Sequence, residues 1–149
     1  MSNYELYHQH PVNKFLHFIC IPMIVLTSMN FLNNIYLCSL KSKFGYDLEI
    51  NLRSLLLLVY GIHYLKSSWL IGTIMMIYML SFSYLSDYWQ KRDKYWILNS
   101  LKLFTLSWII QFIGHYIEGV RPALMDSLSS ALFEAPLFSL NYIVPFLEN

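Results

Sequence analysis

Three histidines and one carboxylate near the two ends of an apolar sequence have the types and spacing of a metal site. His8 and His17 lie near the start, and His115 and Glu118 lie near the end. Imidazole is a good ligand for iron, copper, zinc and nickel. Ionisable side chains in lipid-buried segments are costly and usually functional. We therefore expect the three histidines to hold a transition metal where the fold brings them together.

The residues around His115 share one face of the helix that the sequence predicts there. Gln111 precedes His115 by four positions and Glu118 follows it by three, and residues at these spacings are neighbours on a helix surface. Such a polar face belongs inside a bundle or in a wet cavity rather than against lipid. The alternative is a structural hydrogen-bond network between helices.

The residues around His17 repeat this arrangement near the start. Pro11 suits the first turn of a helix, where its missing N–H is tolerated. Asn13 and His17 then lie four positions apart on one face. His8 precedes the helix and can approach from another direction. A lone interfacial histidine needs no metal, but three placed together favour one.

The ligand set indicates a mononuclear site. Two histidines and a carboxylate with open positions are typical of non-haem Fe(II) oxygenases, and three histidines are a related arrangement. A membrane di-iron site of the eight-histidine type is excluded, because the chain has five histidines. Of these, we interpret His10 as a solvated or spare residue and His63 as interfacial.

Further polar residues of the two motifs are candidates for supporting roles. Asn13, Gln111 and Glu118 can each orient an imidazole through its second ring nitrogen. Glu118 is also a candidate for moving a proton. Lys14 and Arg121 can neutralise an anionic head group, and Arg121 can do so with two parallel hydrogen bonds. These residues complete the predicted site.

The composition predicts a protein that is embedded in a membrane. Of the 149 residues, 56% are hydrophobic and 13% are charged, whereas soluble domains carry about 25% charged residues. The net charge is +1 and no basic tract is present, so nucleic-acid binding is excluded as a function. We interpret residues 1–149 as a single membrane-embedded helical domain.

Five apolar segments predict an all-α fold, a multi-pass transmembrane helical bundle of about four to five spans. A span needs roughly 20 residues. The second segment is short and suits a tilted or partial span, and Pro136 and Pro145 divide the last into two short or re-entrant pieces. A polar loop is expected after the first segment, where three asparagines favour an end near Phe31. The segments are Phe15–Leu37, Ser54–Leu65, Trp69–Leu85, Tyr95–Ile117 and Leu128–Phe146.

The topology predicts that both motifs lie at one membrane face. If four spans separate the motifs, the chain crosses an even number of times, and His17 and His115 return to the same side. Most positive residues lie in the loops after the first and third spans, which the positive-inside rule assigns to the cytoplasm. The histidines are then expected at the opposite face.

The two motifs resemble those of the Mpo-type 2-hydroxy fatty acid dioxygenases, a family of small multi-pass membrane proteins. The similarity spans nearly the whole chain and is most specific in the motifs. Some relatives have a second histidine directly after the first, where this chain has Gln9 and an offset His10. The residues that carry the resemblance are Tyr4, His8, Pro11, Asn13, Lys14, His17 and Pro22, with Trp108, the run Gln111–His115, Glu118 and the run Pro122–Leu124.

The resemblance implies an enzyme that uses Fe(II) and O₂ to shorten a 2-hydroxy fatty acid by one carbon, an α-oxidation. It assigns His8, His17 and His115 to the metal and leaves open whether a fourth histidine binds. It also implies a place in the breakdown of phytosphingosine and fatty acids. The chain would then be integral to the endoplasmic reticulum membrane in a eukaryote, or to the inner membrane in a bacterium, and surrounded by membrane lipid.

Two other functions agree with the same residues. One is a zinc-dependent membrane hydrolase with Glu118 as its base, which metal identity and independence of O₂ distinguish from a dioxygenase. The other is a structural or lipid-binding membrane protein whose polar motifs lock helices together. In that case no metal is bound, and histidine substitutions lower stability.

Overall fold

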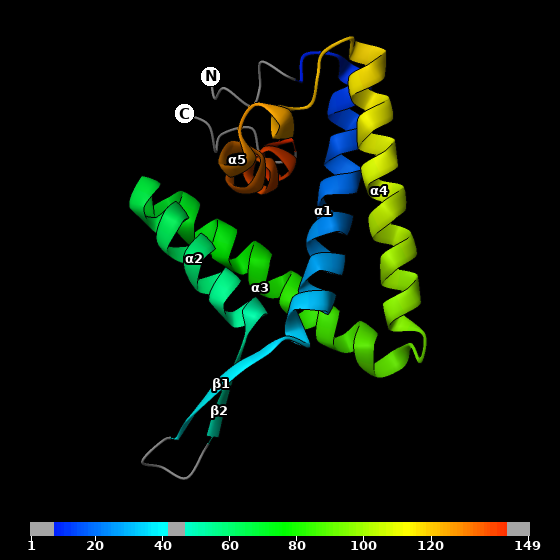
Figure 1. The fold of residues 1–149 in the computed structure, drawn as a ribbon. Helices are drawn as coiled ribbons and strands as arrows, with labels where there is room; N and C mark the ends of the chain where they lie inside the picture. The colour runs from blue at the N-terminus through cyan, green and yellow to red at the C-terminus, as the bar shows by residue number, and fades with distance from the viewer. Residues whose placement is uncertain (1–7, 42–46, 143–149) are drawn as a thin grey trace. The chain divides into compact units, whose positions relative to one another are not determined.

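The fold is all-α, and each of the five predicted apolar segments contains a helix. The computed structural model describes residues 8–41 and 47–142 (Figure 1). Tyr4 of the first motif, and the predicted continuation of the last segment through Pro145, lie outside the described residues. The elements are α1 (Pro11–Asn33), β1 (Tyr36–Lys41), β2 (Asp47–Asn51), α2 (Leu52–Ser67), α3 (Trp69–Arg92), α4 (Trp96–Glu118), the 3₁₀ helix η2 (Ala123–Met125) and α5 (Leu128–Asn141).

Three helices are long and apolar enough to cross a membrane, which supports an integral membrane protein. Among the described residues these are α1, α3 and α4, with 23, 24 and 23 residues. Helix α2 has 16 residues and α5 has 14, and at about 1.5 Å per residue both are shorter than the roughly 30 Å hydrocarbon core. The length of α2 agrees with the tilted or partial span predicted there. Helix α5 runs unbroken through Pro136, so the prediction that this proline divides the last segment was wrong, because a proline inside a helix removes one backbone hydrogen bond and can bend the helix without ending it.

The described residues form two compact units, and each unit contains one part of α1 and one part of α4. One unit joins the chain up to Val25 with the chain from Leu101 onward, and the other comprises Leu26–Ser100. In the first unit the beginning of α1 lies beside the end of α4 (Figure 1). Both motifs therefore belong to the first unit. The single domain over residues 1–149 stays a prediction.

A close approach of α2 and α3 organises the second unit. A Cβ atom on Gly72 would lie 2.8 Å from the backbone nitrogen and Cα of Leu65. Backbone atoms cannot move aside as a flexible side chain can, so only glycine allows the two helices this separation. Small residues serve the same purpose in many membrane helix pairs.

Hydrogen bonds between polar side chains tie together the helix ends of the second unit. Asn30 donates to the Ser100 hydroxyl at 2.7 Å, and Gln90 donates to the Asn30 carbonyl at 3.2 Å. Arg53 forms an ion pair with Asp87 at 2.7 Å. Because buried polar groups need partners, these bonds explain how α1 tolerates asparagine in its last turns.

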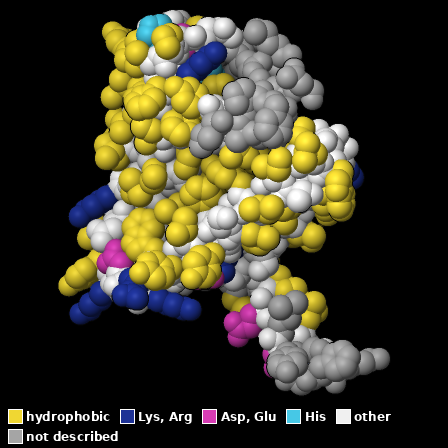
Figure 2. All heavy atoms as spheres, turned by 180° about the vertical axis from the view of Figure 1, so that it is seen from behind, with side chains coloured by type: hydrophobic (Ala, Val, Ile, Leu, Met, Phe, Trp, Pro, Cys, Tyr) yellow, Lys and Arg dark blue, Asp and Glu magenta, His cyan; other side chains and the backbone are white. Residues whose placement is uncertain are grey.

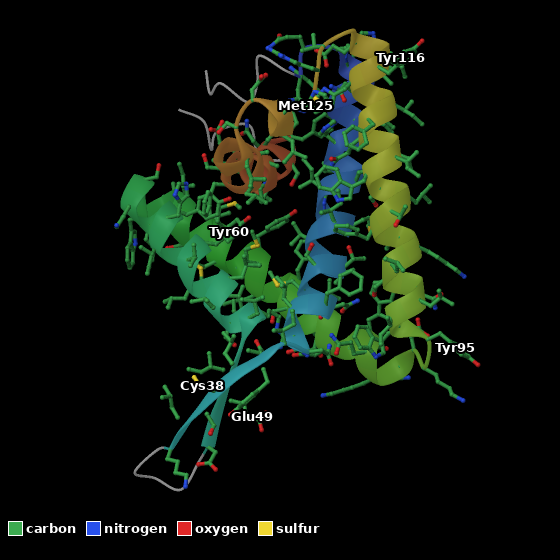
Figure 3. All side chains as sticks on the ribbon, viewed as in Figure 1. Cys38, Glu49, Tyr60, Tyr95, Tyr116 and Met125 are labelled. Atoms are coloured by element: carbon green, nitrogen blue, oxygen red, sulfur yellow. The ribbon has the colours of Figure 1, made fainter. Side chains whose placement is uncertain are left out.

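The polar loop predicted after the first apolar segment is instead an antiparallel hairpin in its described part. Helix α1 ends at Asn33, and the pairs Cys38↔Ile50 and Ser39↔Glu49 set the register of β1 and β2. Neighbouring residues of a strand point to opposite faces, so Cys38 and Glu49 lie on opposite sides of the ribbon (Figure 3). The end predicted near Phe31 is close to the observed end of α1 at Asn33, whereas the hairpin that follows was not predicted.

Asp93 holds the turn between α3 and α4, where Lys and Arg side chains gather (Figure 2). Its carboxylate accepts hydrogen bonds from the Tyr95 backbone at 2.8 Å, the Asn99 amide at 2.7 Å and the Trp89 indole at 2.9 Å. These bonds, led by that from Asn99, lower the pKa of Asp93 below its ordinary value of 3.8.

We expect Asp93→Ala to lower the melting temperature at pH 7 and to have little effect in strong acid. The native pKa is depressed, so the stabilisation is fully present above pH 3.8 and is lost as the pH falls through the lower native value. Thermal unfolding of both proteins in detergent, followed from pH 7 downward, measures this. A constant difference in melting temperature at every pH would contradict it.

Candidate metal centre

Three buried histidine rings lie together in the first unit. His8 precedes α1, His17 lies in its second turn, and His115 lies in the last turn of α4. Their exposed fractions are 0%, 2% and 5%. The ring centroids are 4.3 Å apart for His8 and His17, 4.9 Å for His8 and His115, and 4.8 Å for His17 and His115.

The ring nitrogens fit a shared metal ion. One ligand atom from each histidine lies within 4.8 Å of the other two. The His17 Nδ1 atom lies 3.0 Å from the Asn13 backbone oxygen, and donating this bond leaves its Nε2 lone pair available. The His115 Nδ1 atom is buried and has no hydrogen-bond partner. Buried polar atoms nearly always have a partner, and a metal ion would supply one here.

Glu118 fixes the chain beside His8. Its carboxylate accepts hydrogen bonds from the backbone N–H groups of Gln9 and His10 and from the side-chain amide of Asn13. A carboxylate is favoured at the N-terminus of a helix, where backbone N–H groups lack partners within the helix. Glu118 of α4 thus caps α1 and holds the segment that carries His8.

We expect Glu118→Gln to weaken metal binding by about 10- to 100-fold, the usual effect of changing a residue that holds a metal ligand in place. The amide oxygen can still accept from the backbone of Gln9 and His10, but its NH₂ group would face the NH₂ group of Asn13. Metal titration monitored by elemental analysis after dialysis tests this. Glu134→Gln, on α5, is the matched control and should leave the affinity unchanged. Unaltered binding in Glu118→Gln would contradict the positioning role.

Gly114 allows α1 and α4 to meet at the histidines. A Cβ atom on Gly114 would overlap the Asn13 side-chain oxygen and lie 3.2 Å from its Cγ and 3.4 Å from the Leu16 Cδ1. The side chain of Asn13 is itself bonded to Glu118. The absence of a side chain at position 114 therefore sets the distance between the helices that carry His17 and His115.

Helix α5 covers the rings of the first unit from another direction. The Phe138 ring lies 5.0 Å from the His8 ring, and Tyr142 stacks on Phe18 with the ring centroids 4.7 Å apart. Sequence reasoning missed Phe138, because one aromatic residue among many apolar ones carries no distinguishing signal.

The remaining candidates have different surroundings. Gln111 is buried near the histidines on α4, whereas Lys14 is half-buried. Arg121 is 72% exposed and lies 3.4 Å from Asp126. The His10 ring accepts a hydrogen bond from the Val12 backbone at 3.2 Å and is not part of the described histidine cluster. His63, the other weak candidate, is exposed on α2 in the second unit.

The comparisons with known proteins agree on one family. The family model described as 2-hydroxy-palmitic acid dioxygenase Mpo1-like matches residues 1–146. The 2-hydroxy-palmitic acid dioxygenase MPO1 of Saccharomyces cerevisiae is 32% identical over 136 residues, which cover 91% of this chain and 72% of the yeast protein. No solved structure matches significantly. With matches over nearly its full length, the chain belongs to the Mpo1-like 2-hydroxy-palmitic acid dioxygenase family.

Proposed function

We propose that this protein is an Fe(II)-dependent dioxygenase that shortens 2-hydroxy fatty acids by one carbon. The observation that carries the proposal is the buried cluster of His8, His17 and His115, whose ring nitrogens fit one metal ion. Three neutral imidazoles leave coordination positions open for substrate and O₂. Bound Fe(II) supplies the redox chemistry by which O₂ oxidises the substrate.

The overall reaction balances without an external reductant. Cleavage of the bond between C1 and C2 of a 2-hydroxy acid by one O₂ gives the acid that is one carbon shorter, together with CO₂ and H₂O. The four electrons that reduce O₂ come from the substrate. A protein with one small metal site and no second redox cofactor is sufficient for this stoichiometry.

In this proposal, residues around the histidines guide the substrate to the metal site and keep water away from it. Exposed apolar side chains on α4, such as Ile109 and Ile113, face lipid, so the acyl chain reaches the site without leaving the membrane. Lys14 and Arg121 are the candidates for holding its carboxylate at the mouth. Phe138 excludes water from the rings by packing on His8. In a eukaryote the lipid would come from sphingoid base breakdown in the endoplasmic reticulum, and in a bacterium from the inner membrane.

Glu118 argues against the zinc hydrolase. A general base must be free to turn toward water and take its proton, but this carboxylate is held in place by hydrogen bonds from two backbone N–H groups and one side-chain amide. The same bonds give it a positioning role in the dioxygenase.

Metal content and O₂ use test the proposal together. The full chain is purified anaerobically, its metals are measured, and it is then given O₂ and 2-hydroxyhexadecanoic acid. We expect about one iron per chain and equal amounts of O₂ consumed and pentadecanoic acid formed. Zinc in place of iron, with turnover that needs no O₂, would assign the hydrolase. Absence of metal and of turnover would assign a structural role.

A further inference from the structure

Gln111 has a buried side-chain NH₂ group without a partner. Its side chain is 6% exposed, and its Nε2 atom has no hydrogen-bond partner. A buried donor without a partner costs the desolvation penalty of the group, which an apolar side chain of similar size avoids. Each such group in a folded protein needs an explanation, and an absent ligand is one.

Gln111 lies next to the histidines but does not support them. It precedes His115 by one helical turn on the buried face of α4, about 6 Å along the helix axis. Neither the Nε2 atom of Gln111 nor the Nδ1 atom of His115 has a hydrogen-bond partner, so the NH₂ group does not donate to that ring. The Nδ1 of His17 is held by the Asn13 backbone instead. The amide is therefore left to bind something that enters the site.

The position of Gln111 along α4 indicates which atom of the substrate its side-chain amide can reach. Helix α4 ends at Glu118, so Gln111 lies deeper in the membrane than His115. A fatty acid held by its carboxylate at the mouth places C2 and its hydroxyl deeper than C1. A neutral amide donor suits a neutral hydroxyl, whereas the charged carboxylate suits cations such as Lys14.

We propose that the Gln111 amide donates a hydrogen bond to the 2-hydroxyl oxygen of the substrate and so selects 2-hydroxy acids over unsubstituted ones. This inference rests on the proposed function. A buried site built to bond a hydroxyl rejects the analogue that lacks it, because the partner group is then left unpaired. Gln111 would thus be a specificity-determining residue that touches the substrate.

Anaerobic binding tests the inference without turnover. The iron-loaded full chain in detergent is titrated with 2-hydroxyhexadecanoic acid and with hexadecanoic acid, and the ratio of their dissociation constants gives the preference. We expect Gln111→Leu to reduce the wild-type preference about tenfold, the size of one hydrogen bond to a buried group. The affinity for hexadecanoic acid should stay unchanged. Leu106→Ala, an exposed position on α4, should leave the ratio as it is.

Three results would overturn the inference. Loss of iron in Gln111→Leu would show that the amide supports the metal ligands. Equal weakening of both acids would show that it binds the carboxylate that they share, or that the fold has changed. Wild-type protein that binds neither acid would overturn the proposed function, and this inference with it. A second readout separates misfolding from specificity, because removal of the unpaired amide should leave the melting temperature of the ligand-free variant equal or higher.

Discussion

Replacing His115 by alanine should remove the bound metal and abolish turnover while the chain stays folded. The ring is one of three that lie within 4.9 Å of one another by their centroids. Residues that only support a ligand are typically worth about 10- to 100-fold in metal affinity, so loss of a ligand should exceed about 100-fold. The Nδ1 atom of His115 has no hydrogen bond to lose, which limits the effect on the metal-free fold to packing.

Iron per chain, product formation and thermal unfolding measure these three effects. His63→Ala is the matched control, since it removes another histidine from a helix, at an exposed position in the second unit. It should keep metal and turnover. Full turnover in His115→Ala would refute the assignment of the ligand. A parallel loss of stability in metal-free protein would instead indicate that the histidines lock helices together.

The meeting of His17 and His115 was predictable because helix periodicity puts each of them on a polar helix face, and such a face needs another part of the protein to cover it. The contacts of Glu118 were not. Spacing assigns Glu118 to the same face as His115, but its partners include the backbone N–H groups of Gln9 and His10. Every residue except proline offers such a group, so the residue types at positions 9 and 10 do not indicate that Glu118 binds there.

The β1–β2 hairpin was missed because a short amphipathic strand resembles the frayed end of an apolar span. Cys38 and Leu40 alternate with the polar Ser39 and Lys41, but the strand covers only six residues and closely follows a 23-residue apolar helix. Hydropathy over a span-length window averages the alternation away. Pairing with β2, a non-local contact, decides the conformation.

Gly114→Ala should weaken metal binding even though alanine favours helix formation. In an isolated helix the change from glycine would stabilise by about 1 kcal/mol. Here the added Cβ would overlap the side-chain oxygen of Asn13. Displacement of Asn13 breaks its hydrogen bond to Glu118, and Glu118 holds the backbone beside His8. We expect a loss of about 10- to 100-fold in metal affinity, the range for supporting residues.

Metal titration of Gly114→Ala beside Ile113→Ala separates this effect from a general disturbance of α4. Ile113 is exposed on the same helix, and its truncation should leave metal affinity unchanged. The double variant Gly114→Ala with Asn13→Ala removes the overlap but also the amide that Glu118 binds, so it should regain thermal stability without regaining full affinity. Wild-type affinity in Gly114→Ala would show that the histidines tolerate a wider separation of the helices. The proposed sequence, in which the added Cβ displaces Asn13, Asn13 releases Glu118 and Glu118 releases the backbone beside His8, would then be wrong. It begins with the overlap between the Cβ and Asn13, which occurs only where the two helices keep their present distance.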